Sequence, residues 1–205
     1  MWHRTILQFL FPPRCVVCGV EGMLLCDRCA SLFPQRPHPV SVGFWALSPY
    51  HHPVTERLVH AMKYEGKKNL TETAGLMLSR VIPTILGSER AEVVVVPIPS
   101  SRNERAKRGY DHLELIAQSL SVHSGMTFFP ALEKIRETER QVKMGSRSER
   151  LKNLEGAFHQ RGMALHGKTV LLIDDVTTTG ATFREAQRAL AGSGATEIVC
   201  LAIAH

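Results

Sequence analysis

The sequence has no long apolar run. No stretch approaches the roughly 18 residues of a membrane-spanning helix, so we expect no membrane insertion. The N-terminal segment, MWHRTILQFLFPPRC, is faintly like a secretion signal. However, its apolar part is short, Gln8 interrupts it, and Pro12 and Pro13 follow without a small-residue cleavage site. We therefore expect the segment to be retained and the protein to be cytoplasmic.

Aromatic residues are scarce, and acidic residues are fewer than basic ones. Only 6% of the residues are aromatic, and they are not interleaved with the basic runs, which argues against a strong stacking platform for bases. With 25 Lys and Arg against 19 Asp and Glu, the net charge is +6. This balance favours anionic partners such as phosphates, nucleotides or nucleic acid, but it does not distinguish among them.

The chain has the size of one ordinary domain with a small appendage. With 205 residues and 44% hydrophobic content, it can bury a sizeable core. A proline-rich stretch over residues 34–39 is typical of a linker. We therefore predict an N-terminal module over residues 1–38 and a main domain over residues 39–205.

The N-terminal module contains two Cys-x-x-Cys pairs. These are Cys15 with Cys18 and Cys26 with Cys29. Such spacing brings four thiolates within reach of one tetrahedral Zn²⁺, which would be structural because no coordination position stays open. Disulfides are the alternative, but nothing else in the chain indicates export. Cys200, within the apolar run 198–203, is expected to be a small buried hydrophobic residue.

The most informative stretch is residues 168–190, KTVLLIDDVTTTGATFREAQRAL. Residues 170–173 form a continuous apolar run, typical of a strand buried on both faces of a parallel sheet. The run stops at Asp174 and Asp175, and a threonine-rich turn leads into a helical pattern. Because open α/β sheets bind ligands at the carboxyl ends of their strands, we expect a ligand here.

The turn after the two acids has the residue types of a phosphate cradle. Amides at a helix N-terminus attract phosphate, hydroxyls add donors, and glycine permits close approach. The predicted cradle consists of Thr177, Thr178, Thr179, Gly180, Ala181 and Thr182. Asp174 and Asp175 would repel phosphate, but they can accept hydrogen bonds from the vicinal hydroxyls of a ribose, with or without Mg²⁺ nearby. The alternative is that Asp175 and Thr177 merely cap the helix.

A second buried-strand pattern, residues 92–99, leads into a basic loop over residues 100–110. This loop should leave the same edge of the sheet, so Arg102, Arg105 and Arg108 are candidates to hold a pyrophosphate. Taken alone, the loop would be read as a solvated surface. Residues 132–158 are polar and lack a broad apolar face, which indicates either a surface excursion or a mobile lid over the site. Further predicted elements are strands at 44–50 and 197–204 and helices at 54–64, 70–86 and 111–124, the second bent or ended near Pro83.

Two resemblances follow from these motifs. The string LLIDDVTTTGAT resembles the phosphoribosyl-pyrophosphate (PRPP) motif of type I phosphoribosyltransferases, and nearly the full chain resembles the ComF family. The matching motifs are LFPPRC at 10–15, KYEG at 63–66, PIP at 97–99, RGY at 108–110, Arg136-x-Thr138-x-x-Gln141, Arg150-x-x-Asn153 to Ala157-Phe158, and DDVTTTGAT at 174–182.

The resemblance implies a type I phosphoribosyltransferase-like α/β fold, a parallel sheet flanked by helices, with a zinc-ribbon-like N-terminal module. It also implies binding of PRPP or another ribose 5-phosphate compound with Mg²⁺, and a role in DNA uptake for natural transformation alongside DNA-uptake proteins. As an enzyme, the protein would transfer ribose 5-phosphate to an acceptor and release pyrophosphate. Asp174 and Asp175 would hold the ribose, and Arg105 and Arg108, with Arg102, would stabilise the pyrophosphate. The alternative is a non-catalytic protein that binds single-stranded DNA or senses PRPP.

The chain departs from the ComF pattern at two places. The family usually has Asn-Gln after RGY, whereas Asp111 and His112 stand there in this chain. An acid beside a pyrophosphate site is unfavourable unless Asp111 faces away or meets a cation. The basic loop also carries Glu104 and Ala106 where arginine is frequent in the family. The residues leave the acceptor and the oligomeric state open.

Overall fold

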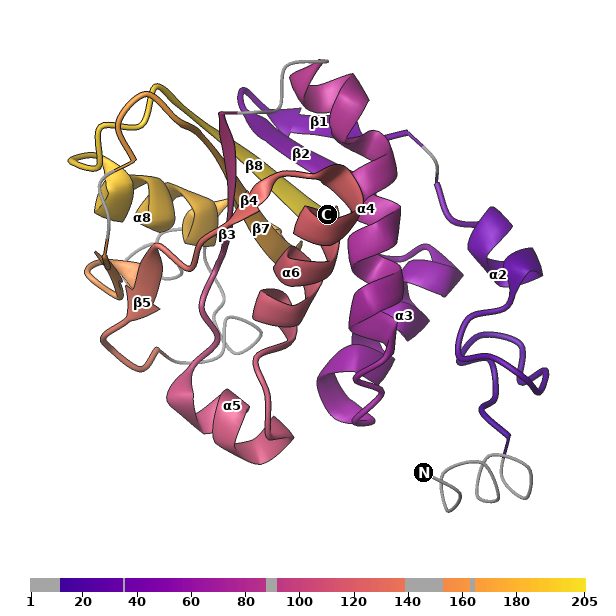
Figure 1. The fold of residues 1–205 in the computed structure, drawn as a ribbon. Coiled ribbons are helices and arrows are strands. Elements are labelled where there is room, and N and C mark those ends of the chain that lie inside the picture. Colours follow the sequence, from indigo (N-terminus) through magenta and orange to yellow (C-terminus); the bar gives the residue numbers. More distant parts are fainter. Residues whose placement is uncertain (1–11, 35, 88–91, 139–152, 163–164) are drawn as a thin grey trace.

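A six-stranded sheet with helices on both faces forms the body of the protein (Figure 1). The computed structural model describes residues 12–34, 36–87, 92–138, 153–162 and 165–205. The strand order is β1-β2-β8-β7-β3-β4, and only the edge strand β1 is antiparallel to its neighbour. The strands are β1 (His38–Ser41), β2 (Phe44–Ser48), β3 (Val93–Pro97), β4 (Thr127–Phe128), β7 (Thr169–Val176) and β8 (Glu197–Ala204). The structure thus has the predicted parallel sheet flanked by helices.

The three central strands, β3, β7 and β8, are apolar because helices cover both of their faces. Helices α3 (Pro53–Tyr64), α4 (Leu70–Leu86) and α6 (His112–Ser124) lie on one side of the sheet, and α8 (Ala181–Leu190) lies on the other (Figure 1). Helix α8 buries an apolar stripe that includes Phe183, Ala186 and Leu190. This packing fixes the carboxyl ends of β3 and β7 relative to each other.

The chain after β3 forms a short helix where the sequence predicted a loop. Helix α5 (Arg102–Arg108) begins at a capping box, in which Ser101 and Glu104 each accept a hydrogen bond from the other's backbone amide, and it ends at Gly109. The loop prediction was wrong because these local caps stabilise a helix that lacks an apolar face. Helix α4 likewise continues past Pro83 and ends before Gly87.

A small antiparallel ribbon, not predicted from the sequence, lies beside α8. Its strands are β5 (Leu132–Lys134) and β6 (Phe158–Gln160). Arg136 Nη2 donates to the carbonyl oxygens of Asn153 (2.9 Å) and Glu155 (2.6 Å), which ties together the two stems that leave the ribbon. Residues 139–152, the centre of the predicted excursion or lid, lie outside the described residues.

The N-terminal cysteine module packs beside α3 (Figure 1). Its helix α2 (Asp27–Ser31) carries Cys29, and Phe33, only 2% exposed, belongs to the same apolar cluster as the main core. Arg57 Nε on α3 donates to the carbonyl oxygen of Val16 between the first two cysteines (2.9 Å). Residues 1–11 lie outside the described part, and no helix within that part is long and apolar enough to cross a membrane.

Candidate functional site

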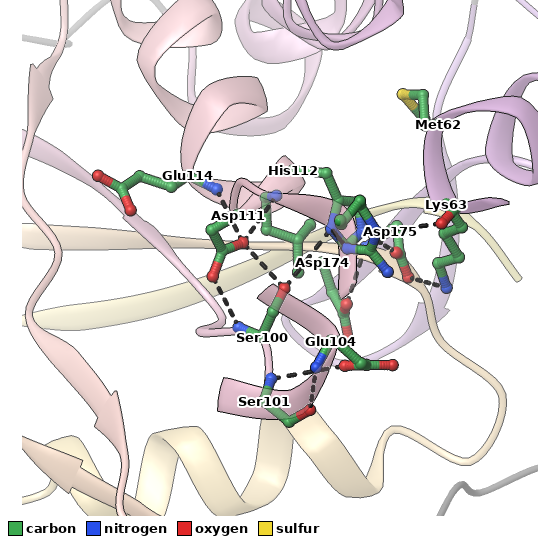
Figure 2. Close-up of polar contacts among 12 residues, drawn as sticks. Met62, Lys63, Ser100, Ser101, Glu104, Asp111, His112, Glu114, Asp174 and Asp175 are labelled. Carbon is green, nitrogen blue, oxygen red and sulfur yellow. Dashed lines mark hydrogen bonds and ion pairs between the residues drawn. The ribbon is translucent and has the colours of Figure 1, made fainter. Parts of the chain in front are cut away.

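The two acids at the carboxyl end of β7 lie at the centre of the site (Figure 2). Both are buried, Asp174 with 6% and Asp175 with 5% of its surface exposed. Because successive side chains of a strand point to opposite faces, the two carboxylates meet different neighbours. Their different surroundings divide the site into two halves.

Asp175 is bound to two cationic or polar side chains from the helices on its side of the sheet. Lys63 Nζ, at the end of α3, lies 2.8 Å from Asp175 Oδ1, and His112 Nε2, at the start of α6, lies 2.5 Å from Oδ2 (Figure 2). Burial would raise the pKa of Asp175, but the Lys63 charge and the bond from His112 outweigh it and hold the pKa well below its usual range. Asp175 is therefore ionised, and Lys63 and His112 hold its carboxylate in place.

His112 connects Asp175 to Arg108. Arg108 Nη1 lies 2.5 Å from His112 Nδ1, and because an arginine can only donate, Nδ1 must accept. The ring proton is then on Nε2, where it is donated to Asp175. Arg108 Nε also donates to the carbonyl oxygen of Lys63 (3.0 Å). The ends of α3 and α5 and the start of α6 thus converge on one carboxylate.

Asp174 has the opposite electrostatic character. Its Oδ1 accepts the backbone amide of Asp175 (2.8 Å), which holds the carboxylate against its own strand. Burial, together with the negative charge of Asp175, raises the pKa of Asp174 to about 7. Lys63 and Lys134 oppose this rise only partly. Asp174 is therefore the acid whose charge is poorly compensated in the unliganded protein.

The loop between β7 and α8 places the predicted phosphate cradle at the same edge. Gly180 has φ +70°, and a Cβ there would lie 2.7 Å from a ring carbon of Phe44, so only glycine fits. The Thr177 amide donates to the carbonyl of Ala204 (2.9 Å), and the Thr178 carbonyl lies 3.2 Å from Nε2 of His205. Thr179 lies in the turn, and Ala181 and Thr182 are the first two residues of α8. Contacts with Ala204, at the end of β8, and with His205 therefore hold the loop in place.

Asp111 caps α6, and it also lines a cavity beside α5. Its carboxylate accepts the backbone amides of Leu113 (3.1 Å) and Glu114 (3.4 Å). The amide and the hydroxyl of Ser100 also donate to it, each at 2.9 Å (Figure 2). Three backbone amides and one hydroxyl thus satisfy this carboxylate, which joins the end of β3 to the start of α6.

The three predicted arginines are divided between two places. Arg102 and Arg105 line a cavity of about 310 Å³ between α5 and the β5–β6 ribbon. Arg108 instead belongs to the network of His112 and the Lys63 carbonyl. Arg102 and Arg105 therefore border an open space. Arg108 instead contacts His112, which in turn binds Asp175.

The four cysteines gather as the spacing predicts. Their sulfur atoms all lie within 4.8 Å of one another, close enough to coordinate one metal ion. Burial would raise the pKa of Cys15, but the backbone amides of Cys18 and Cys26 donate to its sulfur and bring the pKa down to about 6. A soft, four-sulfur donor set of this kind suits a structural Zn²⁺. Cys200 is buried in β8, as expected.

Sequence reasoning missed Lys63, His112 and Lys134. Lys63 stood in the recognised KYEG motif, but nothing local shows that the end of α3 reaches β7. His112 was noted only as a departure from the family, although a histidine at a buried helix start is itself a signal. Lys134 gave no signal beyond its place after Leu132, because its strand was not predicted.

The chain is similar to several known proteins. The model of the phosphoribosyl transferase domain matches residues 79–205. The DNA utilization protein YhgH of Salmonella typhimurium is 28% identical over 194 residues, 91% of this chain and 80% of that protein. Competence protein ComFC of Streptococcus pneumoniae is 34% identical over 125 residues, 60% of this chain and 54% of that protein. Adenine phosphoribosyltransferase from Leishmania tarentolae, a solved structure, is 15% identical with a TM-score of 0.47 and covers 80% of this chain and 79% of its own.

Proposed function

This chain belongs to the phosphoribosyl transferase domain family, and we propose that it binds PRPP at the carboxyl ends of β7 and β3. In this proposal Asp174 and Asp175 accept hydrogen bonds from the ribose hydroxyls, and residues 177–182 hold the 5-phosphate. The pyrophosphate extends toward the cavity lined by Arg102 and Arg105.

The observation that carries the proposal is the unpartnered hydroxyl of Thr177. This residue is 3% exposed, and its Oγ1 has no hydrogen-bond partner in the part of the chain that the structure describes. Buried hydroxyls are almost always paired, so a ligand that accepts or donates here explains the gap. The capping alternative accounts for it less well. The N-cap of α8 is Gly180, which has no side chain to cap with, and Asp175 is bound to Lys63 and His112.

Mg²⁺ is expected to accompany the substrate. The donors near the site are carboxylate and hydroxyl oxygens, which suit a hard cation that keeps substrate phosphates among its ligands. When bound, the ion would neutralise part of the pyrophosphate charge. The protein's own contribution is the arginine pair and the fixed position of the ribose.

We further propose that bound PRPP can be consumed in a transfer reaction. The bond between ribose C1 and the pyrophosphate oxygen breaks, the acceptor forms the new bond to C1, and the acceptor releases its proton. The names of the relatives, a DNA utilization protein and a competence protein, support a role in DNA uptake for this chain. The acceptor is unidentified, so the first test concerns binding.

The direct test is calorimetric titration of PRPP with Mg²⁺ into the wild type and Asp174→Asn. We expect binding by the wild type and a loss of at least tenfold in the variant, because the amide cannot replace an ionised acceptor. Asp27→Asn is the control, since it makes the same chemical change at an exposed residue of α2, outside the cavity lining. Absence of PRPP binding by the wild type, or equal binding by all three proteins, would contradict the proposal.

A second candidate function is binding of single-stranded DNA near the ends of α3 and α5. Lys68 Nζ lies 5.7 Å from the Tyr110 ring centre, and the ring of Tyr64, a 61% exposed residue, lies 5.1 Å from that of His60. The fold thus brings Lys68, after α3, to the ring of Tyr110, after α5, which suits base stacking beside phosphate contacts. We expect oligothymidylate affinity to fall with salt and to weaken in Tyr64→Ala. Salt-independent binding would refute this candidate.

We propose the remaining features on the same footing. Residues 1–38 form a zinc module and residues 39–205 the phosphoribosyltransferase-like domain, with α3 as the element that joins them through Arg57 and Val16. Zn²⁺ would be held by the four cysteines. A cytoplasmic location stays a prediction.

A further inference from the structure

Strand β5 ends in a lysine that faces inward. Residues 132–134 are buried, exposed and half-buried in turn, so Lys134 shares the inner face of the strand with Leu132, while Glu133 is exposed. An unpaired charge is costly at an inward position, which makes an inward lysine informative. Its neighbour across the ribbon, Phe158, is 3% exposed and fixes the strand's orientation.

The inner face of β5 borders the cavity of about 310 Å³. Lys134 lines this cavity together with Arg102 and Arg105. A bond from the Arg102 amide to Glu137 Oε1 (2.9 Å) ties the chain just after β5 to the start of α5, so the cavity walls are connected. The charged residues that line this open space are four basic ones, Arg102, Arg105, Lys134 and Arg161, and three acidic ones, Asp111, Glu114 and Glu133.

The charge of Lys134 also interacts with that of Asp174. Pro97 pairs with Ile173 across β3 and β7, so the cavity wall at Pro97 adjoins the residue before Asp174. Burial lowers the pKa of Lys134, and the negative charges of Glu104, Glu137 and Asp174 oppose this effect. The Lys134 charge in turn lowers the pKa of Asp174. Lys134 thus lines the cavity and lies close enough to Asp174 for their charges to interact.

We propose that Lys134 is a further catalytic residue, whose ammonium group binds the pyrophosphate oxygen joined to ribose C1. This inference rests on the proposed function. A ribose held at Asp174 with its pyrophosphate in the cavity places the scissile C1–O bond beside Lys134. As that bond breaks, the electron pair stays on the pyrophosphate oxygen, and the ammonium stabilises the negative charge that develops there. Arg102 and Arg105 then hold the outer oxygens of the departing group.

The test compares three ligands on three proteins by calorimetry with Mg²⁺ present. The ligands are PRPP, inorganic pyrophosphate and ribose 5-phosphate. The proteins are wild type, Lys134→Met and Lys107→Met, the last removing an equal charge from the exposed face of α5, away from the cavity lining. We expect Lys134→Met to weaken PRPP and pyrophosphate at least tenfold and to leave ribose 5-phosphate within twofold. Lys107→Met should leave all three within about threefold.

Each result decides one claim. Equal weakening of all three ligands by Lys134→Met, or no weakening of PRPP, overturns the role of Lys134 while leaving PRPP binding intact. Failure of the wild type to bind PRPP and ribose 5-phosphate overturns the proposed function itself. Lys134→Arg guards against a folding defect, because it retains the charge and should recover most of the pyrophosphate affinity. If the arginine variant binds pyrophosphate as weakly as the methionine variant, the inference fails.

Discussion

Neutralising the two neighbouring acids of β7 should change stability in opposite directions. Asp174→Asn removes a carboxylate whose pKa is raised from 3.8 to about 7 by burial and by Asp175. Asparagine keeps an oxygen that can accept the backbone amide now bound at 2.8 Å. Asp175→Asn instead leaves the ammonium of Lys63, only 23% exposed, without its counter-charge. We expect the first change to stabilise the unliganded protein and the second to destabilise it.

The magnitude for Asp174 follows from proton linkage. The folded protein holds a proton on Asp174 between about pH 4 and pH 7 that the unfolded chain has lost. The free energy of unfolding of the wild type therefore falls as pH rises through this window and levels off above it. A shift of about three pKa units sets a ceiling of about 4 kcal/mol on this loss. Asp174→Asn lacks the slope, so its advantage should be near zero at pH 4 and about 1 to 4 kcal/mol at pH 8.

The magnitude for Asp175 has a different origin. Its carboxylate is bound by Lys63 and His112, and removing one partner of a buried ion pair costs about 3 kcal/mol or more. Because the pKa of Asp175 is held below its usual range, the stability it contributes is present at neutral pH and is lost only in acid. At pH 8 the two variants should therefore lie on opposite sides of the wild type.

Urea unfolding of the three proteins at pH 5 and pH 8, without ligand, measures these differences. A gain for Asp174→Asn that is the same at both pH values would refute the linkage argument. A loss for Asp174→Asn equal to that of Asp175→Asn would show that the two acids share one environment. Such a result would contradict the division of the site.

Three further predictions concern the loop, the metal and the network. Gly167→Ala, at φ +71° with open space around it, should lower the free energy of unfolding by about 1 to 2 kcal/mol, the cost of a left-handed backbone. Gly180→Ala should cost more, because its Cβ would also lie 2.7 Å from a ring carbon of Phe44. Urea unfolding of both variants measures the difference. Cys26→Ala should abolish stoichiometric zinc in metal analysis of the purified protein, because Cys26 is one of the four clustered cysteines. Cys200→Ala should retain the zinc, because Cys200 lies outside that cluster. His112→Leu should lower the free energy of unfolding by about 1 to 3 kcal/mol, whereas His112→Gln should cost less than half of that.

The central strands were predictable because their sequence pattern has a single physical explanation. Four valines after Glu92 and the run before Asp174 can be buried only between two helical layers, and both became neighbouring strands in the sheet. The ribbon strands β5 and β6 were not predictable, since each has only three residues and no alternation to detect. Their pairing depends on contacts with α8 that the sequence does not encode locally.

The motif at the end of β7 identified the family but not the connections around it. The predicted resemblance to phosphoribosyltransferases and to the ComF family is confirmed by the family match and by relatives such as ComFC. The bond between Lys63 and Asp175 joins residues far apart in the chain, as does the bond between His112 and Asp175. No local pattern predicts such pairs, because the approach of α3 and α6 to β7 is set by helix packing. The same packing separates Arg108 from the other two arginines.

The departure from the family at Asp111 and His112 changes residue names more than it changes hydrogen bonding. Asparagine and aspartate both cap helices through a side-chain oxygen, and Asp111 uses its carboxylate in that role. A glutamine side chain can donate through its nitrogen and accept through its oxygen, as the neutral ring of His112 does toward Asp175 and Arg108. Either residue pair can therefore make hydrogen bonds with the same donors and acceptors at these two positions. His112 thus keeps a hydrogen bond to Asp175. Asp174 is the acid of the pair whose negative charge is poorly compensated.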